Sequence, residues 1–107
     1  DEQWVRGKSL DTFAPLGPEL VTPDAFDPHD AAIWTELDGE RLQDASTRQL
    51  VFDTDELVAF CSRAFTLEPG DLIATGTPFG PDALADGDVV EVEFEGVGTL
   101  RNEVVAP

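Results

Sequence analysis

The segment from Leu67 to Gly80, LEPGDLIATGTPFG, contains the residues best suited to bind a small anion. Thr75 and Thr77 flank Gly76, at the point where the short apolar run 72–74 leads into a turn. Glycine has no side chain to block an approaching ligand, so backbone N–H groups and the two hydroxyls could contact a carboxylate together. The alternative is an ordinary exit from a strand into a loop, because turns of this composition are common.

Lys8 is the second residue whose type suggests chemistry. It is the only lysine, since the other five basic residues are arginine. An ammonium group is a compact charge with three donors, and a guanidinium cannot reproduce its geometry. The alternative to a specific role is chance. The run Gly7-Lys8-Ser9 also resembles the end of a phosphate-binding P-loop, but that motif requires a glycine where Glu2 stands, so we reject it.

Other reactive side chains favour structural interpretations. Cys61 lies on the apolar side of an expected helix, which predicts a buried thiol and not a nucleophile. His29 lies in an acidic, proline-containing loop, where histidine is usually solvent-facing. Glu91 and Glu93 alternate with apolar residues and are expected to form a solvated face. No cluster of histidine and cysteine suggests a zinc site.

The elements that must position these residues are mostly strands. Apolar periodicity and turn signals predict strands at 19–21, 31–37, 40–45, 72–74, 90–94 and 99–105. Asp38-Gly39 is a two-residue hairpin signal between the second and third of these. One helix is predicted over 53–65, with Asp53 and Glu56 spaced as a capping box. The fold class predicted is therefore α+β, mainly β: a twisted, mostly antiparallel roll or sandwich with one packed helix.

Composition limits the possible partners. The 107 residues suffice for one domain, and their formal net charge is −17. Such a chain would repel nucleic acid and anionic lipid, so neither nucleic acid nor a membrane is an expected partner. A strongly acidic folded surface suggests a salt-rich cytosol and a haloarchaeal source. The alternative is an acidic interaction module.

No signal-peptide or transmembrane pattern is present in the sequence, which favours a cytoplasmic location. The chain starts abruptly and without methionine, which suggests a fragment.

Three motifs in this order resemble the fumarylacetoacetate hydrolase superfamily. They are RGKSLDTFAPLGP, LEPGDLIATGTPFG and DGDVVEVEFEGVGTLRN, and the resemblance extends from about Arg6 to Asn102. It implies that residues 1–107 form a single, partial catalytic domain whose N-terminal, metal-binding half is absent. The chain is similar to the 2-hydroxyhepta-2,4-diene-1,7-dioate isomerases and the acylpyruvate hydrolases.

The resemblance also implies roles for particular residues. Lys8 matches a lysine that approaches the substrate and is the implied catalytic residue. Thr77, Gly76 and Thr12 are the implied substrate-binding residues, and Asp11 is a weaker match. The Mg²⁺ or Mn²⁺ ligands, a Glu-x-Glu pair and an aspartate, are expected upstream of Asp1, with none in this chain.

The implied function is that of a metal-dependent enzyme acting on 2-keto or 2-hydroxy-dienoic acids. The reaction would be hydrolysis of a C–C bond, decarboxylation or isomerisation, in the catabolism of aromatic compounds or amino acids. The intact enzyme is expected to be a homodimer that binds a small carboxylic acid, whereas the 107-residue chain alone is expected to be inactive. The alternative is a non-catalytic acidic β domain that serves as a structural or interaction subunit. An upstream Glu-x-Glu and aspartate would favour the enzyme.

Overall fold

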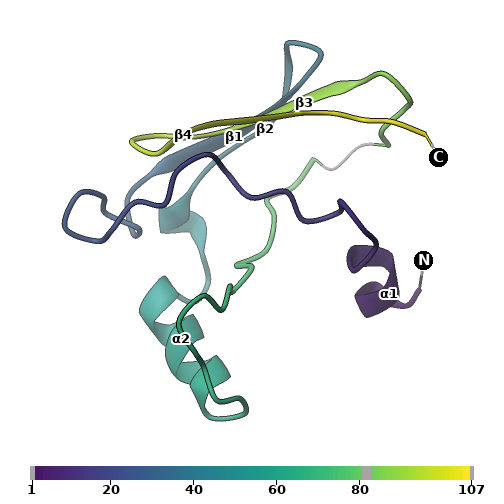
Figure 1. Ribbon diagram of the computed structural model, residues 1–107. Coiled ribbons are helices and arrows are strands. Elements are labelled where there is room, and N and C mark those ends of the chain that lie inside the picture. Colours follow the sequence, from purple (N-terminus) through teal and green to yellow (C-terminus); the bar gives the residue numbers. More distant parts are fainter. Residues whose placement is uncertain (1, 81–82, 107) are drawn as a thin grey trace.

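A four-stranded antiparallel sheet organises the chain, and this confirms the α+β, mainly β fold class. The computed structural model describes residues 2–80 and 83–106. The strands are β1 (Ala32–Leu37), β2 (Glu40–Ser46), β3 (Val89–Phe94) and β4 (Gly98–Glu103), in the spatial order β2-β1-β3-β4. The helices are α1 (Trp4–Lys8), the 3₁₀ turn η1 (Thr47–Gln49) and α2 (Thr54–Ser62). Figure 1 shows α1 and α2 on the same side of the sheet.

The hairpin between β1 and β2 forms where the sequence predicts it. Asp38 and Gly39 have φ angles of 50° and 83°, as a two-residue turn with both central residues left-handed requires. The pairing register shifts in the middle of the hairpin. Thr35 pairs with Gln43 but Glu36 pairs with Arg41, which leaves Leu42 as an extra residue on β2. Such a bulge bends the strand and redirects neighbouring side chains.

The two faces of the sheet differ in chemistry, as the alternation in the sequence predicts. One face is mainly apolar, and on it β1 pairs with β3 as Ile33 with Phe94, Thr35 with Val92, and Leu37 with Val90. The other face carries Glu91, which is 36% exposed and lies 3.6 Å from the Arg101 guanidinium. Arg41 stacks on the Trp34 ring on this face, at 4.7 Å. The predicted solvated role of the β3 glutamates therefore agrees with the structure.

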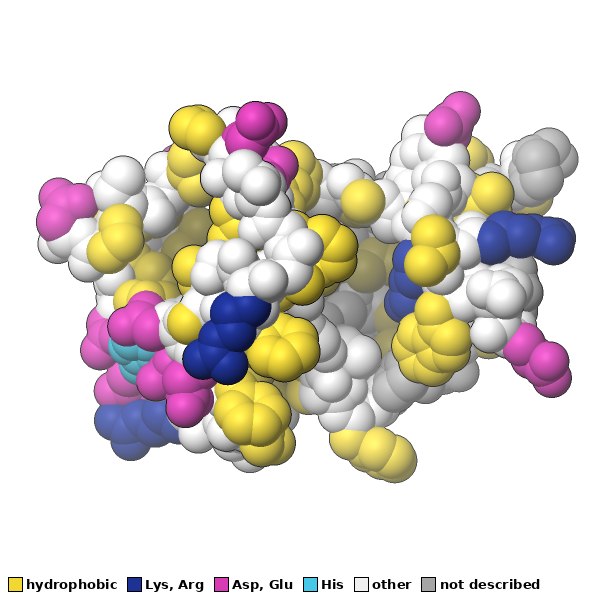
Figure 2. Space-filling view, turned by 90° about the horizontal axis from the view of Figure 1, so that it is seen from below, with side chains coloured by type: hydrophobic (Ala, Val, Ile, Leu, Met, Phe, Trp, Pro, Cys, Tyr) yellow, Lys and Arg dark blue, Asp and Glu magenta, His cyan; other side chains and the backbone are white. Residues whose placement is uncertain are grey.

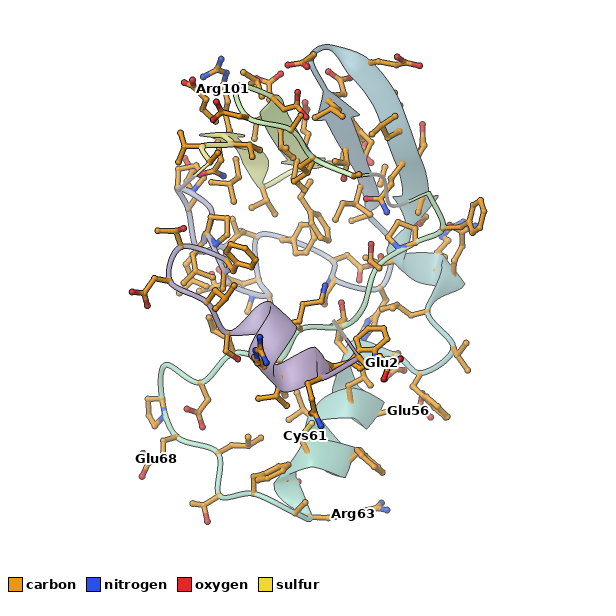
Figure 3. The ribbon with its side chains drawn as sticks, turned by 90° about the vertical axis from the view of Figure 1, so that its right-hand side faces the viewer. Glu2, Glu56, Cys61, Arg63, Glu68 and Arg101 are labelled. Atoms are coloured by element: carbon orange, nitrogen blue, oxygen red, sulfur yellow. The ribbon has the colours of Figure 1, made fainter. Side chains whose placement is uncertain are left out.

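The start of α2 is capped as expected. The Asp53 carboxylate accepts a hydrogen bond from the Glu56 backbone N–H at 2.8 Å, and the Glu56 carboxylate accepts one from the Asp53 N–H at 2.9 Å. The helix ends at Ser62, three residues earlier than predicted. Just beyond this end, the Ala64 N–H donates to the Cys61 carbonyl at 3.0 Å, a bond of the tighter 3₁₀ type that is common at helix ends. Figure 3 shows Glu56, Cys61 and Arg63 progressively farther from the sheet that carries Arg101.

Two predicted strands are wrong, and one helix was not predicted. Residues 19–21 and 72–74 have no regular secondary structure, because no strand in the described part of the chain pairs with them. Leu20 is 93% exposed and Leu72 is 68% exposed, so neither run is buried in this chain. The missed helix α1 is a five-residue segment with no capping side chain and no buried residue, which left no recognisable pattern.

Apolar side chains cover much of the surface instead of filling a core. Ala31 is the only buried residue among those described. Phe26 packs edge-on against Phe94, with ring centroids 5.4 Å apart, under one end of the sheet. Figure 2 shows hydrophobic side chains spread over the face seen from below, and Phe60 and Phe65 of the α2 region are about 70% exposed. Cys61 is only half-buried, because nothing in the described chain covers this side of α2, so the predicted buried thiol is wrong.

Candidate functional site

A cavity of about 480 Å³ lies between the apolar face of the sheet and α2. Its walls come from β1, the end of β2, η1, the start of α2, Phe94 and the segment Thr75–Pro78. Gly76 and Thr77, two of the predicted substrate-binding residues, therefore lie in its wall. The mixture of an apolar lining with a few hydroxyl groups is typical of a small-molecule site.

Gly76 gives the segment a backbone shape that other residues would resist. Its φ angle is 104°, in the region that glycine adopts without steric cost. No atom lies within 4 Å of the position that a Cβ atom would take, so the φ angle and not crowding explains the glycine. This geometry agrees with the predicted approach of a ligand to the Gly76 backbone.

The side chain of Gln43 connects this segment to the sheet. Its Nε2 donates to Thr77 Oγ1 at 3.1 Å and to the Pro78 carbonyl at 3.0 Å. Gly80 approaches the same part of β2 so closely that a Cβ atom there would lie 2.7 Å from the Leu42 carbonyl oxygen. The end of the segment therefore rests on β2 beside its bulge.

Hydroxyl groups from the end of β2, from η1 and from α2 line the cavity as well, but they already have partners. Ser46 Oγ accepts from the Arg48 N–H at 3.3 Å, and the Gln49 side chain completes a capping box around η1. Thr47 Oγ1 accepts from the Ala31 N–H at 2.9 Å. The hydroxyl of Thr54, in α2, lies within hydrogen-bond distance of His29 Nε2, at 3.0 Å.

Lys8 and Thr12 lie outside the cavity wall. Lys8 is the last residue of α1 and is exposed, and Thr12 is exposed in the turn that follows. Neither residue lines this cavity or the smaller one of about 160 Å³ beside β2. Thr12 has a φ angle of 69°, which is rare for a β-branched residue and marks local backbone strain. The roles assigned to both residues, and to Asp11, stay predictions.

The charged groups with resolved contacts or pKa shifts belong to local networks outside the cavity wall. His29 is 43% exposed and lies 3.7 Å from an Asp27 oxygen and 3.8 Å from an Asp55 oxygen. A hydrogen bond from Thr22 Oγ1 lowers the pKa of Asp24 below its ordinary value. The side chain of Asp44 raises the pKa of Arg41 by accepting its hydrogen bond. These groups stabilise loops and the outer sheet face, not the cavity.

Within 2–80 and 83–106, no group of three or more histidine, cysteine, aspartate or glutamate residues could hold an ion. In the same ranges, no helix is long and apolar enough to cross a membrane.

Two residues that support the site were not identified from the sequence: Gln43, which contacts Thr77, and Thr47, which lines the cavity. The capping box that Ser46 and Gln49 form was visible as a serine followed three residues later by a glutamine, so η1 could have been found. Nothing in the sequence marks Gln43, because its contacts with Thr77 and Pro78 cross 34 and 35 positions of the chain.

The chain matches a known family along nearly its whole length. Residues 1–105 match the family described as fumarylacetoacetate (FAA) hydrolase C-terminal. An uncharacterised protein of Archaeoglobus fulgidus is 52% identical over 98% of this chain and 41% of its own length. A mitochondrial oxaloacetate tautomerase of Bos taurus is 46% identical over 97% of this chain and 36% of its own length.

Solved structures show the same fold. A 5-carboxymethyl-2-hydroxymuconate delta-isomerase from Mycobacterium smegmatis is 48% identical, with a TM-score of 0.93 over 98% of this chain and 41% of that one. A maleylpyruvate hydrolase from Sphingobium sp. SYK-6, in complex with manganese(II) and pyruvate, is 41% identical, with a TM-score of 0.86 over 89% of this chain and 36% of that one. The chain thus spans about two fifths of the length of the proteins that it matches.

Proposed function

The chain belongs to the fumarylacetoacetate hydrolase family, and from this we propose that it is the C-terminal part of the catalytic domain of an enzyme that acts on 2-keto or 2-hydroxy-dienoic acids. The observation that carries this proposal is the cavity wall formed by Thr75, Gly76 and Thr77. The tautomerase, isomerase and hydrolase relatives are named for substrates that share a carboxylate next to a keto or enol carbon. A turn with a free backbone approach and two hydroxyls suits that carboxylate.

Each predicted site residue has a distinct task in this proposal. The Thr77 hydroxyl and the Gly76 backbone hold the substrate carboxylate, and the Thr12 hydroxyl supports the neighbouring part of the substrate. Lys8 places its ammonium beside the keto oxygen, where negative charge grows as the enolate forms. A donor that interacts mainly with this developing charge lowers the barrier more than it tightens ground-state binding.

A divalent metal ion, Mg²⁺ or Mn²⁺, is the proposed cofactor, on the basis of the manganese in the maleylpyruvate hydrolase relative. The described residues contain no cluster of three or more histidine, cysteine, aspartate or glutamate side chains that could hold it, so its proposed ligands lie elsewhere in the enzyme, in sequence before Asp1. When bound, such an ion supplies Lewis-acid polarisation of the substrate oxygens. In this proposal, other parts of the enzyme complete the site.

The proposed assembly follows from the uncovered surface. Large apolar side chains around α2 and the segment before Gly80 are exposed here, including Phe52, Phe60, Phe65 and Phe79. An exposed apolar surface of this kind normally lies at an interface. The N-terminal half of the domain and a second subunit, in a cytoplasmic homodimer without nucleic-acid or membrane partners, are its proposed occupants.

The test uses the protein that contains this chain, assayed with Mn²⁺ and with Mg²⁺. Substrates are oxaloacetate, maleylpyruvate and a 2-hydroxymuconate, followed by the ultraviolet absorbance of the enol. We expect turnover of at least one of them, loss of activity on treatment with EDTA, and recovery when the metal is restored. If none is turned over and pyruvate does not bind in the presence of Mn²⁺, the second candidate, a non-catalytic acidic subunit, takes its place.

A further inference from the structure

The bulge in β2 turns one strand position toward the candidate site. Leu42 is the extra residue on β2, and Gln43 follows it directly, opposite Thr35. From there the Gln43 side chain reaches the segment 77–80, which is far away in sequence. Bulges often redirect a side chain next to an active site, and this one brings a single amide to the threonine that lines the cavity.

The hydrogen-bond partners fix the orientation of that amide. The Pro78 carbonyl can only accept a hydrogen bond, so the atom 3.0 Å from it is the amide nitrogen of Gln43. The same nitrogen also donates to Thr77 Oγ1, at 3.1 Å. Thr77 therefore receives a hydrogen bond on one of its lone pairs.

This arrangement leaves the Thr77 hydroxyl proton to donate elsewhere. Within the segment, the Thr77 hydroxyl donates only a long hydrogen bond of 3.4 Å, to the Pro78 carbonyl. A carboxylate ligand can only accept hydrogen bonds, so it would compete with that carbonyl for the Thr77 proton. Because the Gln43 amide donates to Thr77, the threonine hydroxyl keeps its proton for an acceptor of this kind.

We infer that Gln43 is a positioning residue, which holds Thr77 in place and sets its hydroxyl as the donor to the substrate carboxylate. This inference rests on the proposed function of Thr77. Gln43 does not itself line the 480 Å³ cavity, so it acts through Thr77 and not on the substrate. The close approach of Gly80 to the Leu42 carbonyl fixes the other end of the same segment.

Two substitutions at position 43 separate hydrogen-bond polarity from packing. Gln43→Glu keeps the size of the side chain but replaces the donor with an acceptor, which would take the Thr77 hydroxyl proton away from the ligand. Gln43→Leu removes both hydrogen bonds. Asn102→Leu, at an exposed position of β4, is the matched amide-to-leucine control.

The measurements are KM, kcat and the inhibition constant of pyruvate, made on the intact enzyme with its metal. We expect Gln43→Leu and Gln43→Glu to raise KM and the pyruvate constant by about tenfold, the size of one lost hydrogen bond to a charged group, with kcat changed by less than about twofold. Asn102→Leu should change neither value. Gln43→Leu added to Thr77→Val should have no further effect, because both act on one interaction.

The outcomes are distinct. If Thr77→Val raises KM but both Gln43 variants behave as wild type, the inference is overturned and the proposed function stands. If the effects of Gln43→Leu and Thr77→Val add fully, Gln43 does not act through Thr77 and the inference is again overturned. If Thr77→Val changes nothing in an active enzyme, the carboxylate role of Thr77 fails and the inference fails with it. If circular dichroism shows that Gln43→Leu does not fold, the KM and the pyruvate inhibition constant of Gln43→Glu alone decide whether the inference stands.

Discussion

At the scale of single residues, the predicted site residues fall into two groups: some line the cavity and others lie outside its wall. Gly76 and Thr77 both line the cavity, and the Gln43 amide donates a hydrogen bond to the Thr77 hydroxyl. Lys8 ends a short exposed helix that precedes the sheet and lines neither cavity. The two implied roles, carboxylate binding and charge stabilisation, should therefore fail in different ways when they are removed.

Loss of the Thr77 hydroxyl should weaken substrate binding. A carboxylate carries the same charge in the ground state and in the transition state, so a hydrogen bond to it contributes equally to both. Thr77→Val should raise KM by about tenfold, the value of one hydrogen bond to a charged group, and leave kcat nearly unchanged. Steady-state kinetics on the intact enzyme measures this. Thr77→Ser, which keeps the hydroxyl, is the control, and a KM as high as that of Thr77→Val would contradict the role of the hydroxyl.

Loss of the Lys8 ammonium should slow the chemical step. Lys8→Met keeps the length of the side chain but removes a charge that matters most as the enolate forms, so kcat should fall by roughly a hundredfold or more. Lys8→Arg should not restore kcat, because a planar guanidinium needs more room than an ammonium. Single-turnover rates on the folded variant give the answer, and a wild-type rate in Lys8→Met would exclude Lys8 from the site.

At the scale of elements, local signals in the sequence correctly predicted two features that are stabilised by their own residues. The Asp38-Gly39 turn and the Asp53–Glu56 capping box needed no distant partner, and both were found. The runs 19–21 and 72–74 have strand composition, but a strand also needs a neighbour, and that depends on the whole domain. Gln43 was missed for the same reason, since its role exists only through contacts with residues 77 and 78.

The capping box of α2 should make a measurable contribution to stability. Asp53→Ala removes the acceptor for the Glu56 N–H and should lower the free energy of unfolding by about 1 kcal/mol. Urea denaturation of the intact protein, followed by circular dichroism, measures the change. Glu19→Ala is the control, because Glu19 is exposed and lies outside regular structure. Equal stability of the Asp53→Ala variant and the wild type would show that tertiary contacts alone hold α2.

At the scale of the whole molecule, two surface properties have opposite consequences. The exposed apolar side chains favour association with another protein surface, whereas a net charge of −17 opposes any compact state by self-repulsion. The relatives named above come from Archaeoglobus fulgidus, bacteria and a mammal, and they give no support to a haloarchaeal source. Adaptation to a salt-rich cytosol therefore rests on the charge alone and stays a prediction.

That prediction is tested by removing salt. At about 0.01 M ionic strength the Debye length is about 30 Å, comparable to the dimensions of this chain, so most surface carboxylates would repel one another. At about 1 M it is near 3 Å, and the repulsion is screened. If the acidic surface reflects adaptation to high salt, the intact protein should lose part of its circular dichroism signal on dialysis to low salt and regain it in molar KCl. Equal melting temperatures in both conditions would refute adaptation to high salt and leave the acidic surface to be explained by a partner.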